Sequence, residues 1–195
     1  MTIACLFGTF DPPHRGHLHI ARRVLAVPGI DRVWLVVTPR NPFKLGRTLS
    51  PDGDRMAMVR LAVAGQEGVE ASDAELALPP PNYTVDSLAH FRARWPEHRF
   101  ALVIGSDNLA GFHRWKDPEG ILAHHRVLVY PRPGADPHHA VPDLAGRPGI
   151  TLLEGPVMDV SSTRIRALVR AGGDPGDLLP PAVAEYIGRN GLYRD

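Results

Sequence analysis

The sequence predicts an α/β fold: a single Rossmann-like, doubly wound parallel sheet with helices on both faces, of the nucleotidylyltransferase type described below. Short apolar runs alternate along the chain with helical patterns, which is typical of βαβ units. Runs such as Ala101–Ile104 are continuously apolar, as in strands that are buried on both faces of a parallel sheet. A length of 195 residues suits one domain with a sizeable core. We therefore expect one domain over residues 1–195, with a C-terminal helical segment at about 162–195 packed on it.

Five strands and five helices are expected from these patterns. The strands are expected at Ile3–Phe7, Val33–Thr38, Phe100–Ile104, Val127–Tyr130 and Thr151–Leu153. The helices are expected at Leu18–Val27, Asp52–Ala64, Val85–Trp95, Thr163–Ala171 and Pro181–Asn190. Ser50 followed by Pro51 is typical of a helix start, and Gly172-Gly173 is typical of a helix end.

The composition narrows the class of partner. With 44% hydrophobic and 22% charged residues the chain is typical of a globular protein, and its 22 Lys+Arg nearly balance 21 Asp+Glu. Binding to DNA or RNA usually needs a basic stripe, so we expect no nucleic-acid partner. No run approaches the roughly 18 apolar residues that span a bilayer, and no signal peptide is evident. A single cysteine, Cys5, fits a reducing compartment, so we expect a cytoplasmic protein. The sequence does not determine the oligomeric state, and a homodimer is one of the alternatives.

The segment Gly8–His17 reads G-T-F-D-P-P-H-R-G-H and lies between an apolar run and a helical pattern. His14 and His17 are three residues apart, so their rings share one face of the helix start, beside N–H groups without partners inside the helix. Free N–H groups, the helix dipole and imidazole donors together suit a polyphosphate. Asp11 is expected to cap this helix. The alternatives are a helix start with two exposed histidines or a metal pair, and two histidines alone make a poor zinc site.

A second anion site is expected at Ser161-Ser162-Thr163-Arg164-Ile165-Arg166, which follows an apolar run and opens a helix. Residues three apart share a helix face, whereas residues two apart diverge. Arg166 therefore matches Thr163 better than Arg164 does, and its planar guanidinium suits phosphate. The alternative is a basic first turn without function, which the helix dipole disfavours.

Three further residues have both a structural and a functional interpretation. Asp107, just after Gly105, is either a helix cap or an acceptor for ribose hydroxyls. Trp115 is either a core residue or a platform for a flat heterocycle, with cation–π attraction if that ring is charged. Lys44 is either a solvated surface residue or a point charge for phosphate. We find no nucleotide-binding G-x-x-x-x-G-K-[ST] or G-x-G-x-x-G motif and no clear metal cluster, and the adjacent His124-His125 pair is expected at the surface.

Together these motifs resemble the nucleotidylyltransferase superfamily with the H-x-G-H signature and, within it, the bacterial nicotinate-nucleotide adenylyltransferase family. The resemblance covers nearly the whole chain. Further matching motifs are P-N-Y-T from Pro81, I-G-S-D from Ile104, Trp115, R-P-G from Arg132, V-S-S-T-R-I-R from Val160 and D-L-L-P-P-A-V-A-E-Y-I-G-R-N-G-L-Y from Asp177. The chain departs from the family at the single Gly8, where two glycines are usual, and at Phe43, where P-P-H-K is common.

The resemblance implies that ATP and nicotinate mononucleotide react to give deamido-NAD and pyrophosphate, with Mg²⁺ carried by the ATP phosphates and no metal ligand on the protein. It implies three catalytic residues, His14, His17 and Arg166, with His17 nearest the α-phosphate. The ATP-binding residues that it implies are Gly8, Thr9, Phe10, His14, His17, Gly105, Asp107, Ser162, Thr163 and Arg166. The mononucleotide-binding residues that it implies are Lys44, Tyr83, Thr84 and Trp115.

The resemblance further implies that Gly105 and Asp107 hold the adenosine ribose, and that Ser162 and Thr163 join Arg166 in holding pyrophosphate. Trp115 would stack on the pyridine ring, and the backbone of Tyr83-Thr84 would receive its carboxylate.

Such a transfer needs positioning and charge stabilisation rather than a nucleophilic side chain. Three alternatives stay open. One is an enzyme that uses nicotinamide mononucleotide or both pyridine nucleotides, and another is a phosphopantetheine adenylyltransferase, in which Trp115 would have no role. The third is a non-catalytic nucleotide-binding module, which would be marked by loss of His17 or Arg166.

Overall fold

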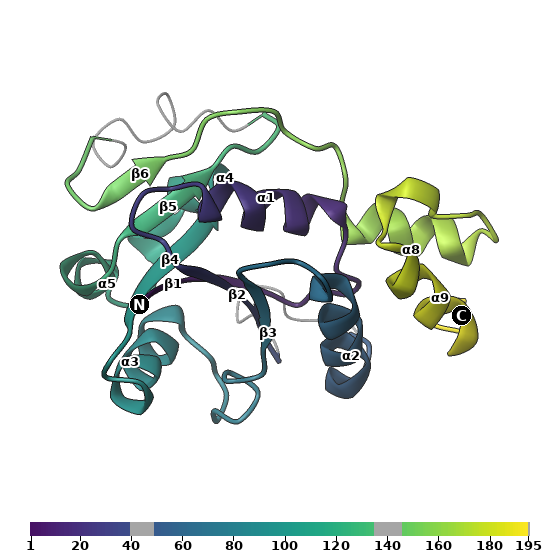
Figure 1. Ribbon diagram of the computed structural model, residues 1–195, viewed down its shortest axis with the longest axis horizontal. Coiled ribbons are helices and arrows are strands. Elements are labelled where there is room, and N and C mark those ends of the chain that lie inside the picture. The colour runs from purple at the N-terminus through teal and green to yellow at the C-terminus, as the bar shows by residue number, and fades with distance from the viewer. Residues whose placement is uncertain (40–48, 135–145, 195) are drawn as a thin grey trace.

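The computed structural model describes residues 1–39, 49–134 and 146–194 of the chain. At its centre lies a six-stranded sheet, parallel at every pairing, in the order β3-β2-β1-β4-β5-β6 (Figure 1). The strands are β1 (Thr2–Gly8), β2 (Arg32–Val37), β3 (Val69–Ser72), β4 (Arg99–Gly105), β5 (Val127–Tyr130) and β6 (Ile150–Leu152). The order reverses between β1 and β4, which is where doubly wound sheets bind ligands. The predicted fold class is confirmed.

Helices cover both faces of this sheet. They are α1 (Arg15–Leu25), α2 (Asp52–Val63), α3 (Thr84–Arg94), α4 (Ser106–Ala110), α5 (Pro118–His124), α8 (Ser162–Arg170) and α9 (Pro181–Arg189), with 3₁₀ turns at Phe112–Arg114 and Gly176–Leu178. Ala4 and Leu6 of β1 face one apolar cluster with α1 and α2, whereas Ile3 and Cys5 face a second cluster with α3, α4 and α5. This alternation explains why the strand is apolar throughout.

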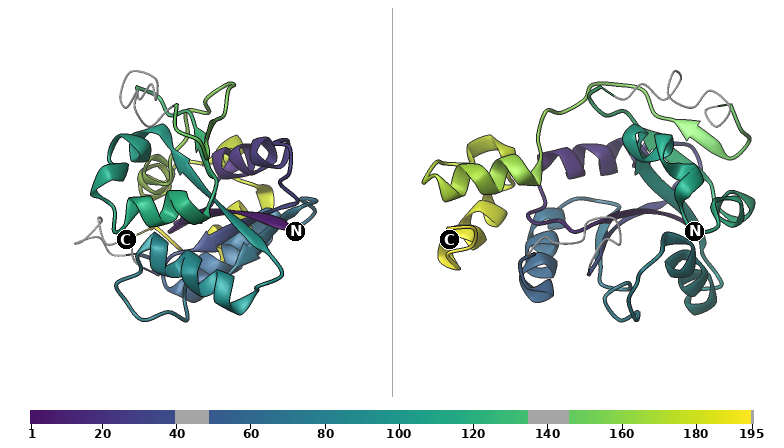
Figure 2. Two further views of the ribbon diagram at one scale, coloured as in Figure 1. Left: turned by 90° about the vertical axis from the view of Figure 1, so that its left-hand side faces the viewer. Right: turned by 180° about the vertical axis from the view of Figure 1, so that it is seen from behind.

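The C-terminal helices α8 and α9 lie at one end of the sheet, next to the start of α1 (Figures 1 and 2). The Tyr186 hydroxyl of α9 donates to Asp54 of α2 over 2.7 Å, and Val183 and Ile187 are buried in the cluster that α1 and α2 share. The segment after the sheet is therefore fastened to elements from the first third of the chain.

Each of the five predicted strands is present, with bounds that differ by at most one residue. The sixth strand, β3, was not predicted because it is short and alternates polar Glu70 with apolar neighbours. For four of the five predicted helices, the first and last residues lie within one residue of the prediction. The exception is α1, which begins at Arg15 rather than Leu18 and ends at Leu25.

Two local predictions need correction. Pro51 was expected in the first helical position after a Ser50 cap, but it has ψ 144° and is itself the residue before the helix. His125 was expected at the surface, but it is buried and its Nδ1 lies 2.8 Å from the carbonyl oxygen of Phe100. The stop at Gly172 is confirmed, since this residue has φ +75° and its N–H donates to the carbonyl of Val169 over 2.9 Å.

Candidate active site

A cavity of about 610 Å³ opens at the carboxyl ends of β1 and β4. Every candidate site residue that the structure describes lines it: Gly8, Thr9, Phe10, His14, His17, Tyr83, Thr84, Gly105, Asp107, Trp115, Ser162, Thr163 and Arg166. Lys44 and Phe43 lie outside the described residues. The residues named from separate motifs are thus brought to one site, of a volume typical of small-molecule pockets.

The start of α1 places its two histidines side by side. His14 is the residue before the helix, and its backbone N–H donates to Nδ1 of His17 over 3.1 Å. The two rings stack with centroids 3.7 Å apart. Because Nδ1 of His17 accepts this bond, the proton of the neutral ring is on Nε2. His14 is 5% exposed, and burial, followed by the charge of Arg132, lowers the pKa of its imidazole to about 4.

Gly16, the glycine of the H-x-G-H pattern, allows a close approach. A Cβ at this position would lie 2.7 Å from Cγ1 of Val160 and 2.9 Å from Nδ1 of His14. Any larger residue would therefore push apart α1 and the segment that leads into α8. The Phe10 ring fixes the other side of the turn, packing over Gly8 and edge-on to His17, with ring centroids 4.9 Å apart.

Asp11 does not cap α1, contrary to the prediction. Its carboxylate instead accepts hydrogen bonds from the Tyr193 hydroxyl over 2.6 Å and from the backbone N–H of Ser50 over 3.4 Å. Burial and the Asp11 carboxylate raise the pKa of the Tyr193 hydroxyl, which favours its role as a donor. The aspartate thus joins the turn after β1 to the start of α2 and to the C-terminal segment. Its carboxylate bonds these distant groups instead of the N–H groups at the start of α1.

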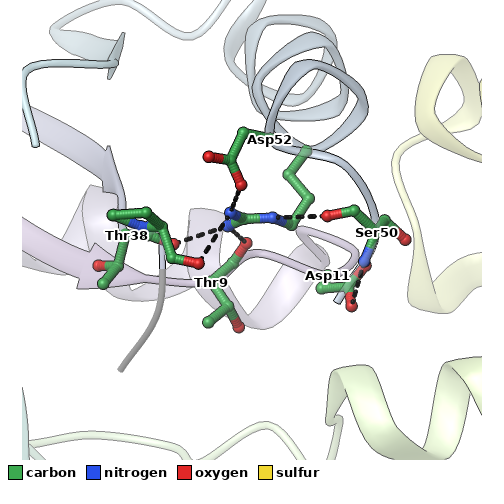
Figure 3. A network of polar contacts seen from close by, with 7 residues as sticks. Thr9, Asp11, Thr38, Ser50 and Asp52 are labelled. Carbon is green, nitrogen blue, oxygen red and sulfur yellow. Dashed lines mark hydrogen bonds and ion pairs between the residues drawn. The ribbon is translucent and has the colours of Figure 1, made fainter. Parts of the chain in front are cut away.

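Arg55 of α2 is fully buried, and the sequence interpretation missed it. Its guanidinium donates to the carbonyls of Thr9 over 2.7 Å and Thr38 over 2.8 Å (Figure 3). Further acceptors are the Ser50 carbonyl at 3.1 Å, the Pro39 carbonyl at 3.3 Å and the Asp52 carboxylate. The loops after β1 and β2 are therefore fastened to one buried cation.

The start of α8 forms part of the cavity wall. The Ser162 hydroxyl donates to the carbonyl of Pro12 over 2.9 Å, and Arg166 donates to the carbonyl of Asp11 and to the Thr163 hydroxyl, the latter over 3.3 Å. Arg164 does not line the cavity and pairs with Asp159 at 3.4 Å. Arg166 rather than Arg164 thus faces the site, as the spacing predicts.

Gly105 and Asp107 lie together where β4 ends. A Cβ on Gly105 would lie 2.3 Å from Oδ1 of Asp107, so a larger residue would displace that carboxylate from its present position. Arg132 is 3.7 Å from Asp107 and lies over the ring of Tyr130, 5.8 Å from its centroid. This arginine lines the cavity and was given no role in the sequence analysis, although its R-P-G motif was noted.

The opposite end of the cavity carries the aromatic residues. Trp115 packs on Phe112 with centroids 5.3 Å apart and borders the cavity. Tyr83 precedes α3 without capping it through its side chain, so its neighbour Thr84 begins the helix with backbone donors on the cavity wall. Lys116 lies over the Tyr83 ring at 5.1 Å and pairs with Asp86 at 2.7 Å.

Imidazole and guanidinium donors, two helix starts and an aromatic platform thus converge on one cavity. Such a set can orient a polyphosphate against a second substrate and stabilise charge at phosphorus. Across residues 1–39, 49–134 and 146–194, no group of three His, Cys, Asp or Glu side chains is placed to hold a metal ion. None of the helices described is long and apolar enough to cross a membrane.

Comparison with known proteins agrees with this geometry. Residues 5–168 match the cytidylyltransferase-like family. A probable nicotinate-nucleotide adenylyltransferase of Flavobacterium johnsoniae is 41% identical over 194 residues, covering 100% of both chains. Its counterpart in Anaeromyxobacter sp. is 40% identical over 195 residues, covering 98% of this chain and 96% of the relative. The solved structure of Plasmodium falciparum nicotinic acid mononucleotide adenylyltransferase complexed with NaAD has a TM-score of 0.81 at 19% identity, covering 98% of this chain and 97% of that one, and supports the fold.

Proposed function

Because the chain belongs to the cytidylyltransferase-like family and, within it, to the nicotinate-nucleotide adenylyltransferases, we propose that it transfers the adenylyl group of ATP to nicotinate mononucleotide. The products are deamido-NAD and pyrophosphate. The observation that carries the proposal is the meeting of two helix starts at one cavity, where Arg166 of α8 donates to the Asp11 carbonyl in the turn before α1. A triphosphate is expected between these helix starts because the positive dipole ends of both helices favour an anion.

The geometry supports a direct displacement at phosphorus. A 5′-phosphate oxygen of the mononucleotide forms a bond to the α-phosphorus of ATP, while the bond from that phosphorus to the bridging oxygen breaks and its electron pair leaves with pyrophosphate. An ionised phosphate oxygen needs no general base, so the protein's task is positioning and charge stabilisation. His17 offers Nε2–H to the α-phosphate, and the neutral His14 is a second donor beside it.

Arg166 is the proposed cation for the departing pyrophosphate. Its bonds to the Asp11 carbonyl and to Thr163 fix the guanidinium at the cavity wall. A fixed guanidinium stabilises charge on the leaving group without the cost of reorganising as the bond breaks. Ser162 and Thr163 add hydroxyl and backbone donors, and Gly105 with Asp107 is the proposed site of the adenosine ribose.

The pyridine ring of the mononucleotide is proposed to stack on Trp115. That ring is a cationic pyridinium, which an indole face attracts. Its carboxylate accepts hydrogen bonds only, and the backbone donors at Tyr83 and Thr84 supply them at the positive end of α3. Donors with no matching acceptor select the acid over the amide, because an amide would present N–H groups to them.

We propose that Mg²⁺ enters on the phosphate oxygens of ATP. The described cavity wall carries few carboxylates, whereas Mg²⁺ in nucleotide sites is commonly held by substrate phosphates and water with one or two carboxylates. When bound, the ion neutralises part of the phosphate charge and orients the triphosphate.

We also propose a cytoplasmic location and the absence of a nucleic-acid partner, and the oligomeric state is open to test. The near balance of 22 Lys+Arg against 21 Asp+Glu argues against a nucleic-acid partner, and one cysteine fits the cytoplasm. A homodimer is tested by sedimentation over a range of concentrations, since a dimer dissociates on dilution and a monomer keeps one mass.

Pyrophosphate release tests the function. ATP and Mg²⁺ are supplied with nicotinate mononucleotide, with nicotinamide mononucleotide or with phosphopantetheine. We expect release with the acid to exceed release with the amide by about tenfold or more, since a charge-assisted hydrogen bond is lost. Equal rates with acid and amide would overturn the carboxylate selectivity. ATP binding without release from any acceptor would leave only a nucleotide-binding module.

A further inference from the structure

Glu75 is a buried carboxyl in the wall of the catalytic cavity, and the mechanism above does not use it. Its side chain is 2% exposed, and it follows β3 in the loop that leads to α3. Oε1 accepts a hydrogen bond from the Ser87 hydroxyl over 2.5 Å, whereas Oε2 is buried and accepts no hydrogen bond from the residues that the structure describes. Within the described chain, none of the ion pairs includes Glu75, so no cation offsets its negative charge.

Glu75 lies against the same helix start that is proposed to receive the ring carboxylate. The Ser87 hydroxyl that bonds Glu75 is also 3.3 Å from the carbonyl of Tyr83, the residue that precedes α3. Asn82 donates from its side chain to the backbone carbonyl of Glu75 over 3.4 Å. One shared hydroxyl and one amide thus join the buried carboxyl to the first turn of α3, and all of these residues except Ser87 line the cavity.

We propose that Glu75 is a specificity-determining residue which must be protonated for the cavity to prefer a pyridine mononucleotide with a ring carboxylate over its amide counterpart. The proposal rests on the proposed function. An ionised Glu75 and a ligand carboxylate at the Tyr83-Thr84 backbone would be two negative charges sharing one helix dipole, at a site with low dielectric. Binding of the acid and ionisation of Glu75 therefore oppose each other, and this coupling is reciprocal.

The groups around Glu75 favour its neutral form. Burial raises the pKa of its carboxyl, and hydrogen bonding to the Ser87 and Thr38 hydroxyls offsets only part of that rise. On the β1 side the neighbouring titratable group is the Cys5 thiol, whose own pKa burial and Glu75 raise, so that it stays neutral. On α3, Asp86 directly precedes Ser87 in the sequence and pairs with Lys116 at 2.7 Å. Glu75 is thus a titratable group beside this helix start, and its pKa lies above the ordinary range of a glutamate.

The test is the ratio of kcat/KM for nicotinate and nicotinamide mononucleotide, measured from about pH 5, just above the ordinary pKa of a glutamate, to about pH 9. Both substrates carry the same 5′-phosphate and react with the same ATP, so titration of those groups cancels in the ratio, and the ring carboxylate stays ionised throughout. We expect the ratio to fall by about tenfold or more as pH rises. A bound ring carboxylate that shifts the pKa of Glu75 by one unit changes the affinity for the acid by a factor of ten between the two charge states. In Glu75→Gln, which keeps an acceptor for Ser87 and cannot ionise, we expect a ratio that does not change with pH.

A ratio that is constant with pH in the wild-type protein would overturn the proposal, and so would an equal fall in Glu75→Gln. A structural role alone would lower the rates with both substrates together and leave their ratio unchanged. Failure of both substrates to release pyrophosphate would instead contradict the proposed function.

Calorimetry of the wild-type protein gives a second measurement that does not depend on how well the variant folds. Each mononucleotide is titrated above neutral pH in two buffers of different ionisation enthalpy. We expect greater proton uptake with the acid than with the amide, because the acid drives protonation of Glu75. Equal proton uptake with the two ligands would count against the inference.

Discussion

The backbone N–H of His14 donates to Nδ1 of His17 over 3.1 Å, so the residue before helix α1 fixes the tautomer of a catalytic candidate one turn later. A glutamate or glutamine commonly makes this return bond to the residue before a helix. Here an imidazole makes it with Nδ1, so the proton of the neutral ring is on Nε2, and His17 lines the cavity. One side chain thus stabilises the helix start and presents a donor at the proposed α-phosphate site.

This double role yields a prediction about His17. In His17→Asn the amide oxygen stands three bonds from Cα, as Nδ1 does, so it preserves the bond from His14 but does not extend to the phosphate. We expect His17→Asn to keep its melting temperature near the wild-type value and to lose about 100-fold or more in kcat, the usual effect of removing a transition-state donor. Steady-state pyrophosphate release and thermal unfolding measure the two properties. Near-normal turnover would remove His17 from the mechanism.

Arg166 and Arg164 form a matched pair for the second prediction. Both are on the first turns of α8, but Arg166 lines the cavity whereas Arg164 pairs with Asp159 outside it. We expect Arg166→Ala to lower kcat by about 100-fold or more, because charge on pyrophosphate loses its fixed cation. Arg164→Ala should stay within about twofold, since an exposed ion pair contributes little. Equal losses in the two variants would show a general effect of charge rather than a specific contact.

These two residues also show how far sequence interpretation reaches. The choice of Arg166 over Arg164 was predictable because spacing within a helix is fixed, so Thr163 selects Arg166 without any knowledge of the fold. The strands were predictable because buried parallel strands are continuously apolar. β3 lacks that signal, since Glu70 interrupts it and the strand is only Val69–Ser72.

The missed residues depend on contacts between distant parts of the chain. Asp11 looks like a helix cap, yet Tyr193 bonds it from the far end of the sequence. Arg55 stands three residues after Asp52 and resembles an exposed helical ion pair, whereas the fold closes five acceptors around its guanidinium (Figure 3). Glu75 reads as an ordinary loop glutamate. These polar groups have their roles because the fold buries them, and burial by distant parts of the chain cannot be predicted from a local sequence pattern.

The buried His14 predicts how stability depends on pH. Its pKa is lowered from 6.5 in the unfolded chain to about 4 in the folded protein, first by burial and then by Arg132. Between those values the unfolded state binds more protons, so stability is fully present above pH 6.5 and falls as pH drops toward 4. Across this window we expect the free energy of unfolding of the wild-type protein to fall by about 3 kcal/mol more than that of His14→Asn. Urea unfolding without substrate measures it, with the exposed His113→Asn as control. Parallel pH profiles for wild type and His14→Asn would contradict the prediction.

Arg55 yields a last prediction, about stability that serves the site. In Arg55→Met the buried carbonyls of Thr9 and Thr38 lose their donors and the Asp52 carboxylate loses its partner. Breaking a buried, fully bonded charge commonly costs about 3 to 5 kcal/mol, and we expect a loss of that size in urea unfolding. Arg60→Met is the control on the same helix, because its exposed pair with Asp73 at 3.4 Å should contribute less than about 1 kcal/mol.

Arg55→Lys separates charge from geometry: a lysine restores the charge but has fewer donors than the guanidinium uses here, so it should recover only part of the stability. Full recovery in Arg55→Lys would mean that charge alone, rather than the fork of hydrogen bonds, holds the two loops together.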